Sequence, residues 1–264
     1  MSDKVCLITG GTSGIGLATA AEMKKRGYAV YELSRRAAAQ TEFYHIRADV
    51  TDEQAVNNAV EEILRREDHI DVVINNAGFG VSGAVEFTAL ADAKRQLEVN
   101  FFGMVNVCKA VLPKLRAQGR GRIVNLSSVA GVIPIPFQTY YSVSKAAINA
   151  YTMALANEVR PFGVQVCAVM PGDIRTGFTA ARQKSQLGDE VYGGRISRSV
   201  AGMERDEQNG MRPETAGAYI ASVATRRAVK PLCAIGAQYK LFCVLAKLLP
   251  VRTLNWLVGL IYAK

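Results

Sequence analysis

The sequence predicts an α/β fold, a single doubly wound domain whose parallel sheet of about seven strands carries helices on both faces. Short β-rich apolar runs alternate with helical patterns from the N-terminus to about residue 236. The runs are apolar almost throughout, as in strands covered on both faces, rather than alternating with polar residues. No repeat, low-complexity tract or linker divides the 264 residues, and α/β domains of about 200–250 residues are common.

The elements follow in order. We expect strands at Val5–Ile8, Ala29–Leu33, Phe43–Ile46, Val72–Ile74, Arg122–Leu126, Val164–Val169 and Leu232–Ile235, and helices at about 14–26, 52–67, 92–117, 139–160 and 212–226. Thr51-Asp52 and Pro213-Glu214 are helix-start signals for two of these helices. The connection Arg35–Glu42 is too short for a full crossover helix, so the second crossover is expected to be abbreviated or irregular.

Two stretches depart from this alternation. Residues 177–211 are rich in Gly, Arg, Gln and Ser, and residues 237–264 form an apolar, mildly basic tail. We assign 1–236 to the main domain and 237–264 to a helical extension of it. Three readings of the tail stay open: an amphipathic lid or subunit-packing helix, a membrane-surface helix, or ordinary core.

Composition narrows the class of protein. Hydrophobic residues make up 49% and charged residues 21%, which excludes disordered, collagen-like and disulfide-scaffold proteins. The longest apolar run, Leu254 to Ala263, is too short for a transmembrane span, and the N-terminus lacks the apolar region of a signal peptide. Five cysteines without a C-x-x-C motif indicate reduced thiols, so we expect a soluble cytoplasmic protein.

The formal net charge of +9 has two explanations: a polyanionic partner such as anionic lipid or a phosphorylated cofactor, or a solvated basic surface. The positive residues are scattered in pairs and form no basic block, which argues against nucleic acid. Only His45 and His69 are available as histidine ligands, and neither lies in a ligand-like cluster, so no metal site is expected.

A glycine-rich turn, Thr9 to Gly16, follows the first strand directly and opens the first helix. Glycines permit close approach of the backbone to a pyrophosphate, and the helix N-terminus supplies free N–H groups and a positive dipole end. The spacing G-x-x-x-G-x-G differs from the most widespread dinucleotide-binding pattern. The alternative is a tight strand-to-helix corner with no ligand.

The end of the second strand bears on the cofactor. An acidic residue near this point favours NAD, whereas an arginine accommodates the 2′-phosphate of NADP. Here the chain reads Ser34-Arg35, and a guanidinium binds a phosphate through two hydrogen bonds. The sequence therefore predicts NADP(H), against the alternative of a solvated arginine pair.

Four further motifs lie at the carboxyl ends of predicted strands, where open α/β sheets bind ligands. They are Asn75–Gly78, Ser127-Ser128, Pro171–Thr176 and, in the helix after Ser128, Tyr141 with Lys145. The spacing of four residues places Tyr141 and Lys145 on one helix face. A tyrosine is a poor acid–base group at pH 7, and a nearby ammonium favours its phenolate.

Taken together, the T-G-x-x-x-G-I-G, N-N-A-G, S-x12-Y-x-x-x-K and P-G-x-I-x-T patterns resemble the short-chain dehydrogenase/reductase family over residues 3–236. The resemblance implies a Rossmann-type fold with Tyr141 as general acid/base and Lys145 binding the nicotinamide ribose and lowering the pKa of the tyrosine. Ser128 would hydrogen-bond the substrate oxygen, in preference to its neighbour Ser127. Asn100 would hold a water in a proton relay, although a merely structural helix asparagine is the alternative.

The resemblance also supplies the cofactor contacts. Asp49 and Val50 would lie beside the adenine, Asn76 and Gly78 behind the adenosine ribose, and Ile174 with Thr176 at the carboxamide. The complete expected cofactor set is Gly10, Thr12, Ser13, Gly14, Ile15, Gly16, Ser34, Arg35, Asp49, Val50, Asn76, Ala77, Gly78, Tyr141, Lys145, Pro171, Gly172, Ile174 and Thr176. The family also implies that residues 177–211 cover the substrate and that the chain forms a homodimer or homotetramer.

The substrate is expected to be apolar, because the loop Val129–Phe137 between Ser128 and Tyr141 is apolar, although such a loop also suits ordinary packing. The tail and Asn76–Gly80 look closer to hydroxysteroid and retinol dehydrogenases. Our first expectation is an NADP(H)-dependent oxidoreductase of lipid or steroid metabolism that interconverts a ketone and a secondary alcohol, with a hydroxysteroid as substrate. The alternatives are a reductase of other lipophilic or xenobiotic carbonyls and a non-catalytic NADP(H)-sensing protein.

Overall fold

Seven strands form one parallel sheet in a computed structural model that describes residues 4–36 and 42–263. In spatial order they are β3 (Tyr44–Arg47), β2 (Ala29–Ser34), β1 (Val5–Thr9), β4 (Val72–Asn75), β6 (Gly121–Leu126), β7 (Val164–Met170) and β9 (Leu232–Ala234). Every neighbouring pair is parallel. The order reverses between β1 and β4, so a crevice is expected at the carboxyl ends of these strands. The predicted parallel sheet is confirmed.

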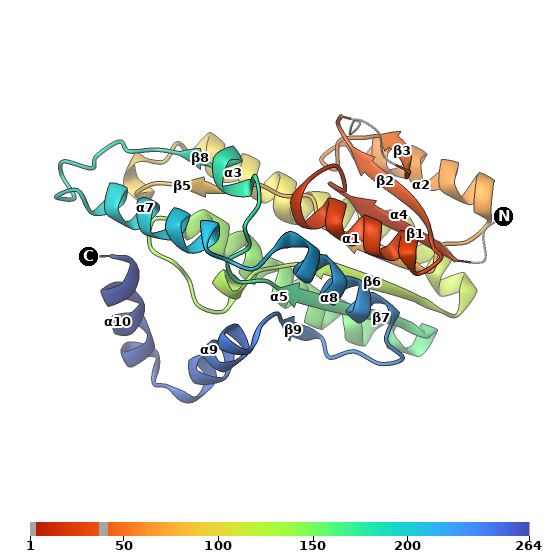
Figure 1. The fold of residues 1–264 in the computed structure, drawn as a ribbon. Coiled ribbons are helices and arrows are strands. Elements are labelled where there is room, and N and C mark those ends of the chain that lie inside the picture. Colours follow the sequence, from red (N-terminus) through yellow and green to blue (C-terminus); the bar gives the residue numbers. More distant parts are fainter. Residues whose placement is uncertain (1–3, 37–41, 264) are drawn as a thin grey trace.

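Helices cover both faces of the sheet (Figure 1). One hydrophobic cluster joins alternate residues of β1 to α2 (Glu53–Glu67), α4 (Gly103–Gln118) and α5 (Thr139–Val159). The second joins the other residues of β1 to α1 (Gly14–Lys25) and α8 (Pro213–Thr225). Successive strand side chains point to opposite faces, so an apolar strand contributes to both clusters at once. Both predicted helix starts hold: Asp52 Oδ1 accepts a hydrogen bond from Ala55 N, and Pro213 opens α8.

The long helix expected at 92–117 consists of three parts. It begins as α3 (Leu90–Leu97), passes through a π-helical turn at Glu98–Phe102, and continues as α4. A π turn inserts one extra residue per turn, which rotates the two α-helical segments relative to each other. Apolar periodicity does not reveal such a turn.

Residues 177–211 form α6 (Phe178–Ala181), β8 (Gln183–Lys184) and α7 (Arg195–Gln208). β8 pairs in parallel with β5 (Val81–Ser82), which makes a separate two-stranded sheet. Elsewhere in the described residues, 3₁₀ turns lie at Val85–Phe87, Val129–Gly131 and Arg160–Phe162. The second crossover expected at 35–42 lies largely outside the described residues.

The chain ends in two helices, α9 (Ala237–Leu248) and α10 (Val251–Tyr262), which stand off from the sheet (Figure 1). α10 returns toward α7, where Tyr262 and Ala263 pack against Ile196, Val200 and Met203. Across the described part of the chain, no helix has the length and apolar character that a membrane crossing requires.

Candidate active site

The carboxyl ends of the central strands open into one cavity of about 1370 Å³. Its walls include every residue expected to bind the cofactor, together with Ser128, Tyr141 and Lys145. Residues far apart in sequence thus meet where the strand order reverses. Of the four residues expected to be catalytic, only Asn100 is absent from the walls.

The glycine-rich turn has the shape of a phosphate cradle. Gly10 and Gly14 adopt φ values of +65° and +53°, which glycine reaches without strain. A Cβ on Gly16 would lie 2.2 Å from the carbonyl oxygen of Gly10, so no larger residue fits there. Asn76 Nδ2 donates to the carbonyls of Thr9 and Gly10 at 3.1 and 2.9 Å and holds the turn against β4. The turn therefore fits the pyrophosphate of a dinucleotide, at the N-terminus of α1.

A buried carboxylate, not identified from the sequence, supports this turn from behind. Glu32 on β2 is 2% exposed, and its Oε1 accepts a hydrogen bond from Gly11 N at 3.0 Å. Its Oε2 lies 2.7 Å from His45 Nδ1 and accepts from Ser34 Oγ at 3.2 Å. A lone acid inside an apolar strand needs partners, so its position in Val30–Leu33 was the available signal.

Ser34, the last residue of β2, and Arg35 line the cavity at the end expected to hold the adenosine. Arg35 is exposed and lines the wall, while Ser34 Oγ also lies 2.7 Å from the carbonyl oxygen of Arg36. Glu32, two residues before Ser34 on β2, is turned inward toward Gly11 and His45. This part of the wall therefore carries a hydroxyl and a cation, a pair that fits a ribose phosphate.

Ser128 and Tyr141, two of the residues expected to be catalytic, both line the cavity. Ser128 caps the 3₁₀ turn Val129–Gly131, and its Oγ accepts from Ala130 N at 3.1 Å. Burial raises the pKa of Tyr141 to about 12, and a side-chain hydrogen bond with Ser128 opposes this rise. Tyr141 is therefore protonated at neutral pH and available as an acid.

Lys145 is buried one helical turn after Tyr141. Its Nζ lies 5.6 Å from the centre of the Tyr141 ring and donates to the carbonyl of Leu126 at 2.7 Å. Burial lowers the pKa of Lys145 to about 8. Ser127 Oγ donates to the carbonyl of Lys145 at 3.0 Å, which gives Ser127 a structural role and leaves Ser128 as the serine hydrogen-bonded to Tyr141.

Asn100 lies in the π-helical turn, behind the cavity wall. It is 1% exposed; its Oδ1 accepts from Phe79 N and its Nδ2 donates to Phe79 O, both at 2.9 Å. Its Nδ2 also lies 3.1 Å from Ser144 Oγ. The side chain thus fixes the strand end Asn76–Phe79 to α5, and the water relay remains a prediction.

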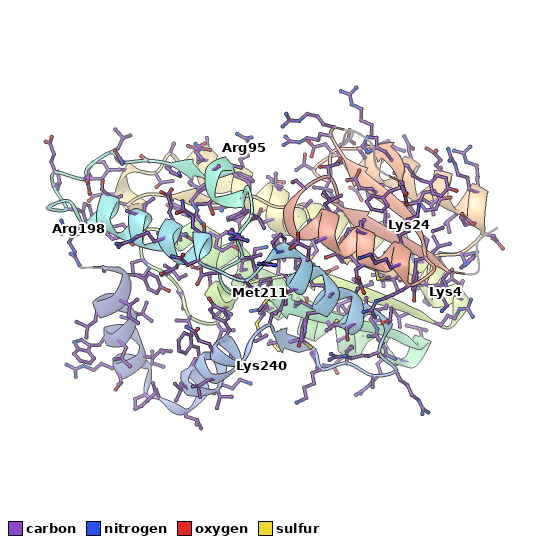
Figure 2. All side chains as sticks on the ribbon, viewed as in Figure 1. Lys4, Lys24, Arg95, Arg198, Met211 and Lys240 are labelled. Carbon is purple, nitrogen blue, oxygen red and sulfur yellow. The ribbon has the colours of Figure 1, made fainter. Side chains whose placement is uncertain are left out.

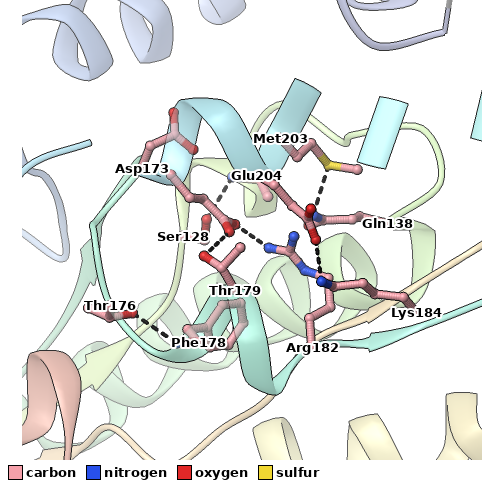
Figure 3. A network of polar contacts seen from close by, with 12 residues as sticks. Ser128, Gln138, Asp173, Thr176, Phe178, Thr179, Arg182, Lys184, Met203 and Glu204 are labelled. Atoms are coloured by element: carbon pink, nitrogen blue, oxygen red, sulfur yellow. Dashed lines mark hydrogen bonds and ion pairs between the residues drawn. The ribbon is translucent and has the colours of Figure 1, made fainter. Parts of the chain in front are cut away.

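Residues of the segment 177–211, expected to cover the substrate, pack directly on Tyr141. The ring of Phe178 lies 5.9 Å from that of Tyr141, and the guanidinium of Arg182 lies 5.6 Å from the Phe178 ring. Arg182 forms a buried ion pair with Glu207 on α7, and Thr179 Oγ1 donates to the same carboxylate (Figure 3). This pair ties α6 to α7 above the site.

The C-terminal helices are anchored on the Pro171–Asp173 loop of the cavity wall. A Cβ on Gly172 would lie 2.1 Å from the ring of Tyr239, so the first turn of α9 packs flat on this glycine. Tyr239 Oη donates to Asp173 Oδ2 at 2.6 Å and accepts from Asp173 N at 3.0 Å. Burial raises the pKa of Asp173. Tyr239 was not identified from the sequence, because no motif links it to Asp173, its partner 66 residues earlier in the chain.

The described residues contain no group of three or more His, Cys, Asp or Glu side chains that could hold a metal ion. Their five cysteines are free thiols, and three of these are buried.

Known proteins match this chain in sequence and in fold. Residues 4–187 match the model of the short chain dehydrogenase family. The chain is 43% identical over 230 residues to a 3-ketodihydrosphingosine reductase of Bacteroides thetaiotaomicron, covering 86% of each chain. A short-chain dehydrogenase from Streptomyces avermitilis superposes with a TM-score of 0.81 at 30% identity, covering 92% of each chain. The structure of ElxO with NADP bound superposes with a TM-score of 0.75 at 27% identity, covering 91% of this chain and 99% of that one.

The glycine-rich turn, the Ser128–Tyr141–Lys145 arrangement and these matches agree. The chain belongs to the short-chain dehydrogenase/reductase family, oxidoreductases that act on CH–OH and C=O groups.

Proposed function

We propose that the protein is an NADPH-dependent reductase of a long-chain ketone, of the 3-ketosphingoid type. The observation that carries this proposal is the continuity of one cavity. It runs from the glycine-rich turn past Tyr141 to the apolar inner faces of α9 and α10. Such a cavity accommodates a dinucleotide at one end and an extended apolar chain at the other.

The chemistry at the centre follows from three side chains. A nicotinamide cofactor, when bound, supplies the hydride. Tyr141 donates its proton to the carbonyl oxygen, and Ser128 donates a hydrogen bond to the same atom as it gains negative charge. Lys145, as a buried cation beside the ring, stabilises the phenolate that remains. The presence of this set favours an enzyme over a cofactor-sensing protein.

The choice of NADPH rests on the adenosine rim. Arg35 offers a charge-assisted hydrogen bond to a 2′-phosphate, worth about 1.5–3 kcal/mol. Exchanging Ser34→Asp with Arg35→Ala removes this partner and adds repulsion, so we expect NADPH affinity to fall at least tenfold while NADH affinity is kept or improved. Isothermal titration of both cofactors measures this. Equal affinities of the unmodified protein for NADH and NADPH would overturn the assignment.

The substrate class rests on the composition of the cavity wall. The curated relative from Bacteroides thetaiotaomicron is named for 3-ketodihydrosphingosine, a long-chain amino ketone. Here Leu245, Leu254 and Leu257 line the end that would hold the chain. Asp206, an exposed acid on α7, lines the same cavity and suits a protonated amine. A hydroxysteroid, the first choice from the sequence, gains no support from the relatives.

One panel separates these substrates. NADPH oxidation is followed with 3-ketodihydrosphingosine, its N-acylated form, a keto-steroid and a retinoid, with Tyr141→Phe as the inactive control. We expect the free amine to be the best substrate by kcat/KM, and Asp206→Asn to reduce that preference. Faster turnover of the steroid would replace the proposal with the competing one.

Assembly and location complete the proposal. Phe102, Val143 and Met153 are large exposed apolar residues on or near α4 and α5, the helices through which the family is expected to form homodimers or homotetramers. Analytical ultracentrifugation tests this, and a monomer at micromolar concentration would contradict it. The free thiols support a cytoplasmic location.

A further inference from the structure

The outer faces of α9 and α10 are apolar and exposed. On α9, Leu241, Val244 and Leu248 recur at intervals of three and four residues, and Leu248 is 74% exposed. On α10, Trp256 and Leu260 are four residues apart, and Trp256 is 61% exposed. We call these five residues the outer face. A helix normally buries its apolar side, so a face of this kind is expected to meet a further surface.

The same helices are apolar on their other side. Phe242, Leu245, Leu254, Leu257 and Ile261 line the substrate cavity. The two helices therefore form a thin apolar wall between the cavity and the exterior, and they stand off from the sheet with side chains on both sides (Figures 1 and 2).

The charge on this wall has one sign. Residues 237–263 contain no Asp or Glu, and Lys240, Lys247 and Arg252 are all exposed. Lys240 and Lys247 are seven residues apart and lie along one edge of the apolar strip of α9, while Arg252 precedes Trp256 by one helical turn. Figure 2 shows Lys240 on α9.

These features decide between possible occupants. A second copy docked face to face would bring the basic residues of both copies together, which like-charge repulsion disfavours. A bilayer with anionic lipids meets both requirements: apolar side chains enter the boundary between headgroups and acyl chains, and the cations meet lipid phosphates. Tryptophan is enriched at this boundary.

We infer that the outer face of α9 and α10 docks the enzyme on an anionic bilayer surface, with the substrate cavity directly behind the docked helices. Docking follows from the exposed residues alone. Only one consequence, that a membrane-borne ketone reaches Tyr141 through this wall, rests on the proposed function.

Co-sedimentation with vesicles tests the docking without any ketone present. Vesicles are made of phosphatidylcholine alone or with a one-third share of phosphatidylglycerol. We expect strong, salt-sensitive binding to the mixed vesicles and weak binding to the neutral ones. The pair Lys247→Gln and Arg252→Gln should weaken binding to mixed vesicles by about thirtyfold, or roughly fivefold per cation. The pair Leu248→Gln and Trp256→Gln should weaken binding to both.

Matched variants control for charge and hydrophobicity. Lys25→Gln with Arg65→Gln removes two exposed cations from other helices, and Leu90→Gln with Leu187→Gln removes two exposed leucines elsewhere. Both should bind vesicles like the unmodified protein. NADPH affinity and turnover of a short water-soluble ketone should stay unchanged in the outer-face variants, which shows that they fold.

Three results would overturn the inference. The first is equal binding to neutral and mixed vesicles, and the second is an equal loss of vesicle binding in the control variants. The third is a stable dimer that dissociates when Leu248 and Trp256 are changed, because a second copy would then cover the outer face. A failure to reduce 3-ketodihydrosphingosine would leave the vesicle result intact, so the two proposals fail separately.

Discussion

Neutralising Glu207 tests how residues 178–208 are held against Tyr141. The side chain of Arg182 is 1% exposed and that of Glu207 13%. Among the described residues, Nε and Nη1 of Arg182 have no hydrogen-bond partner, so Glu207 is the main compensation for this buried charge. Removing one partner of a buried ion pair costs about 3–5 kcal/mol. Because Glu207 retains some contact with water, we take about 3 kcal/mol, which is more than a hundredfold in equilibrium constant.

The expected result of Glu207→Gln is therefore a local opening of residues 178–208. Amide hydrogen exchange in α7 should accelerate by about a hundredfold if the whole of this energy is local. The KM for the ketone should rise at least tenfold, because Phe178 no longer packs firmly on Tyr141. NADPH affinity should change less than twofold, since the glycine-rich turn lies outside the segment.

Two further variants sharpen the test. Glu190→Gln removes the same charge from an exposed position in the same segment and should behave like the unmodified protein. Arg182→Met combined with Glu207→Leu replaces the pair with apolar packing and should recover most of the protection from exchange. Unchanged exchange and unchanged KM in Glu207→Gln would refute the reasoning.

Three more predictions concern the site. Tyr141→Phe should lower kcat by at least about a hundredfold while leaving NADPH affinity unchanged, because it removes only the transferable proton; activity within threefold of normal would contradict the role. Burial lowers the pKa of Lys145 to about 8, so its positive charge is lost as the pH rises through that value. The kcat of ketone reduction should therefore fall between pH 7 and 9. A kcat that stays constant across this range would contradict the role of Lys145. Gly16→Ala should abolish NADPH binding as measured by fluorescence titration, since its Cβ would lie 2.2 Å from the carbonyl oxygen of Gly10. The Cβ of Gly202→Ala meets no neighbouring atom, so this variant should stabilise α7 by up to about 1 kcal/mol in urea unfolding.

Much of this architecture could be predicted because it follows from local patterns. The predicted strands match the sheet strands within one residue at each end, since each is a short apolar run bounded by turn residues. The expected cofactor residues all line one cavity, because the carboxyl ends of parallel strands share one edge of the sheet.

What escaped prediction depends on partners distant in sequence. The β5–β8 pair comprises two residues on each side and forms only where the covering segment meets residues 81–82. The role of Glu32 depends on Gly11 and His45, which the fold brings to its carboxylate from other parts of the chain. The π turn around Asn100 is fixed by contacts to Phe79 and Ser144, which no periodicity encodes.

The contact between Tyr239 and the Pro171–Asp173 loop has a thermodynamic consequence. The ring of Tyr239 belongs to α9, which carries part of the outer face, and it packs on Gly172 and hydrogen-bonds Asp173 in that loop. If cofactor binding shifts that loop, it shifts the position of α9 as well, and linkage then works equally in both directions. If bound NADPH raises the affinity of the helices for a bilayer by some factor, a bound bilayer raises the affinity for NADPH by the same factor. The membrane-bound and the free enzyme would then have different dissociation constants for the cofactor, although the glycine-rich turn is the same in both.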